Sequence, residues 1–406
     1  MEQKKRILVV SQHYYPENFR VTDLCEAFVE DGFEVDVLCG LPNYPHGEWF
    51  EGYSLRGPMR ETRRGVEIFR TKEIRRKNNT SLRIFLNYIS YPLTAVFRLF
   101  SLRKRHYDAV FCYETSPVLM LFPAIVCAGL RRIPLTCYVL DLWPENLYSV
   151  LPIQNRFLRA VAKGVSHWHY RRCSQLVAMS DALGEKLKTI SPRSKVYVIP
   201  QYCEDFYAKE IRDDALRARF SDKFCVLFAG NISPAQNLDL LVQCAVRLRD
   251  AGRSDIHFII VGSGMSREAL EQSVAEHGVQ ALFSFEGQKP AEEIPRYTGY
   301  ADALFAALSA SDDLGLTVPA KITSYLAAGK PCLVSMDGEP ARVIREAGCG
   351  LVSPAGDIDA LYHNLLELAE CSAKARQEMG GRARSYYQAH FSRSMLLKQM
   401  EALFNS

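Results

Sequence analysis

Short apolar runs alternate with helix-like segments along almost the whole chain, and this alternation limits the possible fold more than any other feature. In the first half, a helical period of apolar residues at 21–32 lies between strand-like runs at 6–11 and 33–39. Further strand-like runs follow at 108–113, 135–140 and 175–179. Strands and helices that alternate with short turns predict a doubly wound α/β fold with parallel strands.

The same alternation starts again in the second half. Strand-like runs occur at 224–230, 257–262, 282–287, 301–308, 331–335 and 349–353, with helices expected from 237 and from 266. A chain of 406 residues is too long for one ordinary core. We therefore predict two Rossmann-like domains, 1–200 and 201–380, that face a cleft, and a last helix at about 379–405, so that residues 381–406 pack back across the first domain.

Composition is that of a globular protein, with 48% apolar and 24% charged residues. No uninterrupted apolar stretch is long enough to span a bilayer, and the opening MEQKKRILVV leads directly into a strand, so we expect neither a spanning helix nor a secretory signal. The twelve cysteines include no CxxC pair. We expect buried free thiols in a reducing cytoplasm.

Positive charge is concentrated between residues 60 and 105. This segment has thirteen Lys or Arg and three Glu, a net charge of +10, whereas the whole chain carries +4. Such a segment favours phosphates or an anionic surface as partner. Within it, 81–107 is aromatic and apolar between cations, which is typical of a helix in a membrane interface, although a core helix with a solvated charged end is the alternative. No nucleic-acid partner is expected, because no recognised binding module accompanies the arginines.

Turns after three strands of the second domain carry candidate ligand-binding residues. Any one of them is typical of an ordinary turn, but three together predict a nucleotide pocket at the carboxyl ends of the strands. The candidates are Gly230, Asn231, Gly262, Gly287 and Gln288. Neither a G-x-x-x-x-G-K-[ST] motif nor a G-x-G-x-x-G motif after a first strand is present, which argues against an ATPase and an NAD-type dehydrogenase.

A lysine and a serine lie one turn apart on the next predicted helix, which begins near Pro319 and ends at Gly329. The amides at 318–321 and the ammonium of Lys321 would present positive charge to a diphosphate leaving group. A solvated lysine beside a core helix is the alternative. Ser324 lies one turn further along the same helix.

The loop after the first strand, SQHYYPENFRVTDL (11–24), is the richest polar segment of the first domain. It would place His13, Glu17, Asn18 and Arg20 in the cleft. His13 is a candidate general base, although a histidine in a loop is also a common hydrogen-bonding residue.

Two further segments end near the same cleft. The loop at 41–53 contributes Asn43 and Tyr44, and DLWPENL follows an apolar strand with Asp141, Trp143 and Glu145. A carboxylate at the end of such a strand is costly unless it is paired or functional, so Asp141 and Glu145 are the acidic catalytic candidates. Glu145 could instead cap the following helix.

The sequence resembles family 4 of the glycosyltransferases, which have the GT-B fold, over almost its whole length. The resemblance rests on motifs in a specific order, among them DLWPENL, VIPQYCEDF, FAGNISPAQNLDLLV, FIIVGSGMSREALEQ, PAKITSYLAAGKPCLVS and EAGCGLVSPAGDIDAL. It is most similar to the fucosamine-transferase-like enzymes of bacterial surface polysaccharides such as lipopolysaccharide and capsule. The resemblance implies a nucleotide-sugar donor, UDP-linked in this subgroup, bound by the C-terminal domain, an acceptor bound by the N-terminal domain, and retention of anomeric configuration without a metal or other cofactor.

The donor motif departs from the family pattern. Leu316 and Ser324 occupy the positions of two family glutamates, and Asn231 and Gln236 those of a phosphate-binding arginine and lysine. We therefore expect Lys321 to supply the missing cation, with Ser324 near the ribose.

The resemblance also implies a mechanism, in which the acceptor attacks from the face that the diphosphate leaves. Asp141 or His13 would then orient the acceptor. Together with the basic segment, this favours a polyprenyl-diphosphate-linked glycan acceptor at the anionic inner face of the membrane, with the enzyme cytoplasmic and peripheral. The alternatives are a catalytically silent binding or scaffold subunit of a polysaccharide assembly, a GT-B epimerase and, least favoured, an NAD-type oxidoreductase.

Overall fold

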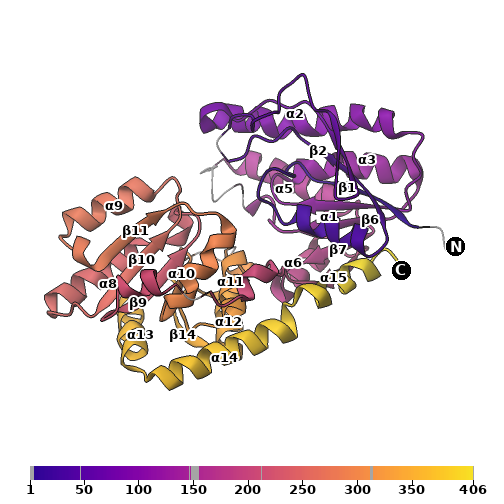
Figure 1. Cartoon of the computed structure of the whole chain (residues 1–406). Coiled ribbons are helices and arrows are strands. Elements are labelled where there is room, and N and C mark those ends of the chain that lie inside the picture. Colours follow the sequence, from indigo (N-terminus) through magenta and orange to yellow (C-terminus); the bar gives the residue numbers. More distant parts are fainter. Residues whose placement is uncertain are drawn as a thin grey trace. The chain divides into compact units, whose positions relative to one another are not determined.

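The computed structural model describes residues 4–45, 47–145, 147, 155–211, 213–310 and 314–405. The chain divides into two compact units: unit 1 comprises Met1–Ile199 and Leu397–Ser406, and unit 2 comprises Pro200–Leu396. Each unit is a sheet covered by helices on both faces (Figure 1).

Unit 1 is built on an eight-stranded sheet in the order β3-β4-β2-β1-β5-β6-β7-β8. Its strands are parallel except for β3, which pairs antiparallel with β4. The strands are β1 (Arg6–Val10), β2 (Glu34–Cys39), β3 (Arg60–Arg63), β4 (Val66–Arg70), β5 (Ala109–Glu114), β6 (Leu135–Val139), β7 (Gln175–Ala178) and β8 (Lys195–Val198). Because β2 and β5 lie on opposite sides of β1, the strand order reverses there, and the carboxyl ends of β1 and β5 are the expected place for a ligand.

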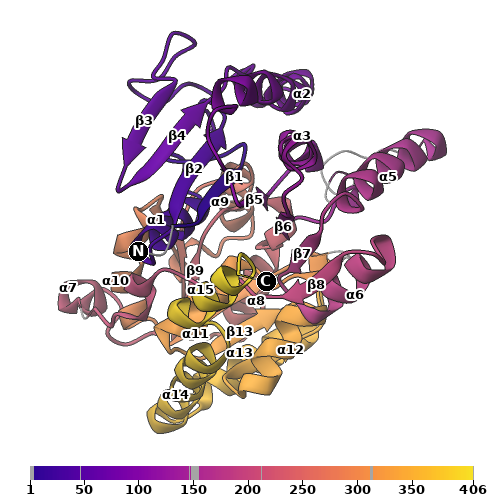
Figure 2. The same cartoon turned by 90° about the vertical axis from the view of Figure 1, so that its right-hand side faces the viewer.

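Helices cover both faces of this sheet. Figures 1 and 2 show α2, α3, α5 and α6 on one side and α1 and α15 on the other. Their bounds are α1 (Val21–Glu30), α2 (Ser81–Leu99), α3 (Phe122–Arg131), α5 (Arg156–Tyr170), α6 (Asp181–Ile190) and α15 (Arg393–Ala402). The C-terminal segment packs on unit 1, as predicted, because the ring of Phe404 lies 5.3 Å from Phe28 of α1 and 5.7 Å from Phe111 of β5.

Unit 2 is built on a six-stranded parallel sheet in the order β11-β10-β9-β12-β13-β14. The strands are β9 (Phe224–Ala229), β10 (Ile256–Val261), β11 (Phe283–Gly287), β12 (Ala303–Ala307), β13 (Cys332–Ser335) and β14 (Gly350–Ser353). The helices are α7 (Asp214–Ala218), α8 (Asp239–Asp250), α9 (Arg267–Glu276), α10 (Ile294–Tyr300), α11 (Ala320–Ala328), α12 (Gly338–Ala347), α13 (Ile358–Glu370) and α14 (Ala373–His390).

Both faces of the unit 2 sheet are buried, which explains the continuous apolar runs in the sequence. Along β9, Leu227 packs into one core and Val226 and Phe228 into the other. The predicted doubly wound parallel fold is therefore confirmed in both units.

The prediction of a single last helix is wrong. The segment forms α14 and α15, separated at Phe391, whose φ of −131° and ψ of 8° leave the helical region. Its side chain is only 4% exposed and belongs to the unit 2 core, so packing of this ring offsets the interruption of the helix.

The cysteines behave as the sequence predicts. All twelve are free thiols, and eleven of them are buried. Across the described ranges, none of the helices has the length and apolar content needed to cross a membrane.

Candidate active site

The sheet of unit 2 offers a ligand site where its strand order reverses. β9 continues to β10 on one side and is flanked by β12 on the other, so the turn after β9 lies at this point. That turn begins with Gly230, which is exposed, and leads to Gln236.

Lys321, on the first turn of α11, reaches this turn. Its ammonium donates a hydrogen bond to Oε1 of Gln236 and lies 3.7 Å from the centre of the Phe228 ring. Burial lowers its pKa well below the usual range, and among the described residues no carboxylate pairs with it. The predicted residues Gly230, Gln236 and Lys321 are thus brought together, with an amine whose charged form a bound anion would stabilise.

The three glycine turns are linked to one another by backbone hydrogen bonds. The N–H of Gly230 donates to Val261 and the N–H of Gly262 donates to Gly287, at 2.9 and 2.8 Å. Gly262 has a φ of +146°, and a Cβ there would lie 1.9 Å from the carbonyl oxygen of Gly230. Gly262 is therefore required by the close approach of two backbones, whether or not it also contacts a ligand.

The remaining donor candidates lie around these turns. Asn231 and Gln288 are exposed, whereas Ser324 is 8% exposed and its hydroxyl donates to the carbonyl of Ala320 at 3.1 Å. Leu316 is partly buried just before α11. The proximity of Ser324 to a ribose stays a prediction.

In unit 1, the loop after β1 forms a buried polar network. His13 is 3% exposed, and its Nδ1 lies 2.7 Å from Oε2 of Glu17. Nη2 of Arg76 lies 3.4 Å from Nε2 of His13, so the second ring nitrogen also has a protein partner. Both ring nitrogens are engaged by the protein, an arrangement that positions the loop and leaves neither nitrogen open to a substrate.

Glu17 connects this loop to the loop after β2. Its Oε1 accepts hydrogen bonds from the backbone N–H groups of Asn43 and Tyr44, at 2.6 and 2.7 Å. Asn43 is fully buried, whereas Tyr44 is 39% exposed, Asn18 is exposed and Arg20 is partly exposed. Of the predicted acceptor residues, Glu17 and Asn43 therefore build the scaffold, and Tyr44, Asn18 and Arg20 are the accessible ones.

Sequence reasoning missed the other half of this network. Glu73 accepts from Nε2 of Gln12 at 3.0 Å and from Nδ2 of Asn43, and burial together with the charge of Glu17 raises its pKa well above the usual range. Arg76, only 7% exposed, donates from Nε to Asn87 at 3.0 Å. Glu73 and Arg76 follow β4, a strand that the sequence did not predict, so their place at a strand end went unrecognised.

A second acidic group lies at the ends of β5 and β6. Glu114 is the last residue of β5 and is fully buried, and the hydroxyl of Tyr170 is its polar neighbour. Burial, reinforced by the charge of Asp141 after β6, raises the pKa of Glu114 well above the usual range. The predicted strand ended at 113, one residue short of Glu114, which is why this carboxyl was missed.

The predicted residues after β6 have protein partners. Trp143 is 7% exposed and donates from Nε1 to Ser116 and from its backbone N–H to the hydroxyl of Tyr170, at 3.0 and 3.1 Å. Glu145 forms an ion pair with Lys186 of α6 at 3.1 Å. Asp141 is partly buried, and its charge acts on Glu114. The hydroxyl of Tyr170 thus links Trp143 to Glu114, and the ion pair with Lys186 gives Glu145 a structural contact.

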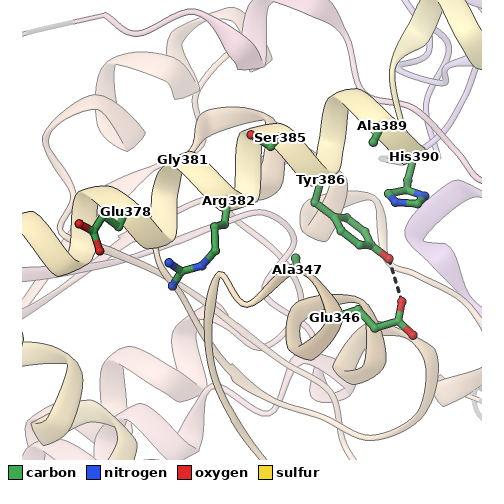
Figure 3. A pocket seen from close by; sticks show the side chains of 9 residues that line it. All are labelled: Glu346, Ala347, Glu378, Gly381, Arg382, Ser385, Tyr386, Ala389 and His390. Atoms are coloured by element: carbon green, nitrogen blue, oxygen red, sulfur yellow. Dashed lines mark hydrogen bonds between the residues drawn. The ribbon is translucent and has the colours of Figure 1, made fainter.

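A hollow of about 640 Å³ lies elsewhere in unit 2, between α12 and α14 (Figure 3). Across it, the hydroxyl of Tyr386 donates to Oε2 of Glu346 at 3.0 Å, and the Tyr386 and His390 rings lie 4.3 Å apart. Its wall includes the last turn of α12, at the opposite end of the sheet from Gly230. The hollow is therefore separate from the Lys321 site.

The two α/β units have mainly parallel sheets, and unit 2 has a lysine at the point where its strand order reverses. Comparison with family models identifies the class of protein: residues 18–201 match the glycosyl transferase 4-like domain, and residues 211–386 match the glycosyl transferases group 1. The chain is thus a glycosyltransferase of the GT-B type, as the resemblance implied.

Relatives and solved structures agree with this assignment. The chain is 21% identical to 2-deoxystreptamine N-acetyl-D-glucosaminyltransferase of Niallia circulans, over 84% of this chain and 85% of that protein. It is 23% identical to WcaI of Escherichia coli (strain K12), named as a colanic acid biosynthesis glycosyl transferase, over 82% and 83% of the two chains. Among solved structures, Anabaena HepE in complex with UDP has a TM-score of 0.72 at 15% identity, covering 99% of this chain and 100% of that one.

Proposed function

We propose that this enzyme transfers a sugar from a UDP-sugar to a lipid-linked or glycan acceptor, with retention of anomeric configuration and without a metal. The observation that carries the proposal is the Lys321 ammonium, held by Gln236 beside Gly230 at the reversal point of the unit 2 sheet. The complex of HepE with UDP and the hexosaminyl transfer named for the Niallia enzyme support a UDP-hexose or UDP-N-acetylhexosamine donor.

The reaction places negative charge on the departing diphosphate. The bond between the anomeric carbon and the diphosphate oxygen breaks as the acceptor oxygen bonds to the same carbon and the acceptor proton passes to the departing phosphate. A buried ammonium near that oxygen stabilises the developing charge more strongly than it would in water. Lys321 is the side chain that we assign to this role, with the turn at Gly230 and the start of α11 as its neighbours.

The acceptor side is assigned to unit 1. Tyr44, Asn18 and Arg20 are its accessible candidates, and Asp141 orients the attacking hydroxyl. We propose a polyprenyl-diphosphate-linked acceptor of bacterial surface polysaccharide synthesis, met at the anionic inner face of the membrane. The basic segment 60–105 and the WcaI resemblance support this proposal.

Calorimetric titration tests the donor site. UDP, GDP, ADP and NAD are titrated into the wild type, Lys321→Ala and the control Lys374→Ala, an exposed lysine of α14. We expect UDP to bind the wild type and the control, and Lys321→Ala to bind it about 10- to 100-fold more weakly, because a charge-assisted hydrogen bond is lost. A screen of UDP-sugars with lipid-linked acceptors then follows.

A catalytically silent binding or scaffold subunit is the second candidate. Leu316 and Ser324 favour it, because they stand where the resembled family has glutamates, and the Ser324 hydroxyl is bonded within its own helix. Absence of nucleotide binding in the wild type would favour this candidate over the transferase.

A further inference from the structure

Exposed apolar side chains gather on three helices of unit 1. Of the sixteen large apolar residues that are exposed in the described structure, eleven lie on α2, α3 and α5 or in the turn after α2: Leu82, Phe85, Leu93, Phe97, Phe100, Leu130, Phe157, Leu158, Val161, Val165 and Trp168. Figures 1 and 2 show these helices on the same side of the sheet. The ring of Phe122 on α3 lies 6.3 Å from that of Trp168 on α5, so the two helices are in contact.

Helix α5 is amphipathic on its outer surface. Phe157, Val161, Val165 and Trp168 recur at helical spacing along one exposed stripe, with Phe157 73% exposed. The inner side packs through Ser166, His169 and Tyr170. A second exposed stripe carries the cations Arg156, Arg159 and Lys163. This helix was not singled out from the sequence.

Helix α2 is apolar on both sides. Asn87, Tyr91 and Ala95 face the protein, whereas Phe85 and Phe97, 57% and 72% exposed, face away from it. The alternative that 81–107 forms a core helix with a solvated charged end thus explains only the inner side of α2. The outer stripe has no partner within the described chain.

The three helices and their flanking turns carry charge of a single sign. Residues 74–107, 117–135 and 155–172 contain fifteen Lys or Arg and no Asp or Glu. Some of these cations, such as Arg76, are buried, but Arg83, Arg103 and Lys104 are exposed. A second copy of this surface would bring cations against cations, whereas an anionic bilayer complements both the apolar stripes and the charge.

We infer that α5, together with α2, binds an anionic bilayer, with the apolar stripe of α5 inserted below the headgroups and its cations among them. Trp168 then lies in the interface, where tryptophan is favoured. The inference deepens the proposed function, because it names the surface on which a lipid-linked acceptor would be met. It makes α5 a membrane-contacting element in addition to the segment that the sequence indicated.

The test is sedimentation with vesicles of phosphatidylcholine alone and of phosphatidylcholine with phosphatidylglycerol. We expect binding to the anionic vesicles only, weakened about 25-fold or more by Arg156→Glu/Lys163→Glu and more than about tenfold by Phe157→Ser/Val161→Ser. The control Leu55→Ser, an exposed leucine that is not on these helices, should bind like the wild type. Wild-type binding by both α5 variants would overturn the inference.

Tryptophan fluorescence places the contact on α5. Trp168 is one of three tryptophans. Brominated lipids should quench part of the wild-type emission, and this quenched part should be absent from the emission of Trp168→Phe. Quenching that is unchanged in Trp168→Phe would contradict a bilayer partner. Light scattering that shows a dimer in the wild type and a monomer in the α5 variants would contradict it as well. UDP binding by the same variants, which should be unchanged, separates failure of this inference from failure of the donor site.

Discussion

The close approach of the turns after β9 and β10 predicts that Gly262→Ala destabilises unit 2. The new methyl group would lie 1.9 Å from the carbonyl oxygen of Gly230, and the backbone has a φ of +146°, which an L side chain rarely adopts. Strain of this kind costs about 1–3 kcal/mol, and forcing an atom into a packed site costs about 1–3 kcal/mol more. We therefore expect Gly262→Ala to lower the free energy of unfolding of unit 2 by about 2–6 kcal/mol.

The control is Gly252→Ala, whose φ is +68° but whose Cβ would meet nothing within 4 Å. It carries the cost of a left-handed backbone without the clash, about 1–2 kcal/mol. Urea unfolding followed by circular dichroism measures both variants, with UDP binding as a second readout. Because the turn at Gly230 must shift to accept the methyl group, Gly262→Ala should also weaken UDP binding, whereas Gly252→Ala should not. Equal stability of the two variants would refute the reasoning.

Three further predictions concern ionisable groups. Burial lowers the pKa of Lys321, and a bound diphosphate should raise it again, so the protein should take up protons when it binds UDP. Calorimetric titrations of UDP in buffers of different ionisation enthalpy should show this proton uptake for the wild type and none for Lys321→Met. Because the pKa of Glu114 is raised, its contribution to stability is complete at low pH and is lost as pH rises through the folded-state pKa. In urea unfolding, Glu114→Gln should therefore be about 1–3 kcal/mol more stable than the wild type at pH 8, and by a smaller margin at pH 5. An equal difference in unfolding free energy at the two pH values would contradict this prediction. Arg76→Met removes the guanidinium that donates to Asn87 and whose charge partly offsets the burial of Glu73, and it should cost about 1–3 kcal/mol. Arg75→Met, which breaks a more exposed ion pair with Glu48, should cost about 0–1 kcal/mol; similar losses would show that the buried network does not need its cation.

Much of the fold could be predicted because buried parallel strands are continuous apolar runs. The strands RILVV and FCVLFA are apolar on both faces, and their ends were placed to within a residue or two. The strands β3 and β4 were missed because RETR, at the edge of the sheet, is entirely polar, and VEIFR, beside it, mixes polar and apolar residues. The break at Phe391 depends on a core contact that no local pattern contains.

Most site candidates could be predicted because they follow the ends of strands, whereas Lys321 and Ser324 were predicted from the helix that carries them. His13, Gly230 and Asp141 follow apolar strands, so sequence order alone placed them at the ligand-binding ends. Glu73 and Asn87 were missed because their burial depends on partners far along the chain, as in the hydrogen bonds of Gln12 to both. The pairing of Lys321 with Gln236, 85 positions apart, likewise required the structure.

The most direct test of the account is the calorimetric titration of UDP into the wild type and Lys321→Ala, with Lys374→Ala as control. The account predicts that UDP binds the wild type and the control with similar affinity, and binds Lys321→Ala about 10- to 100-fold more weakly. Equal affinity for all three proteins would mean that Lys321 does not contact the diphosphate. No binding to the wild type would contradict the donor site itself.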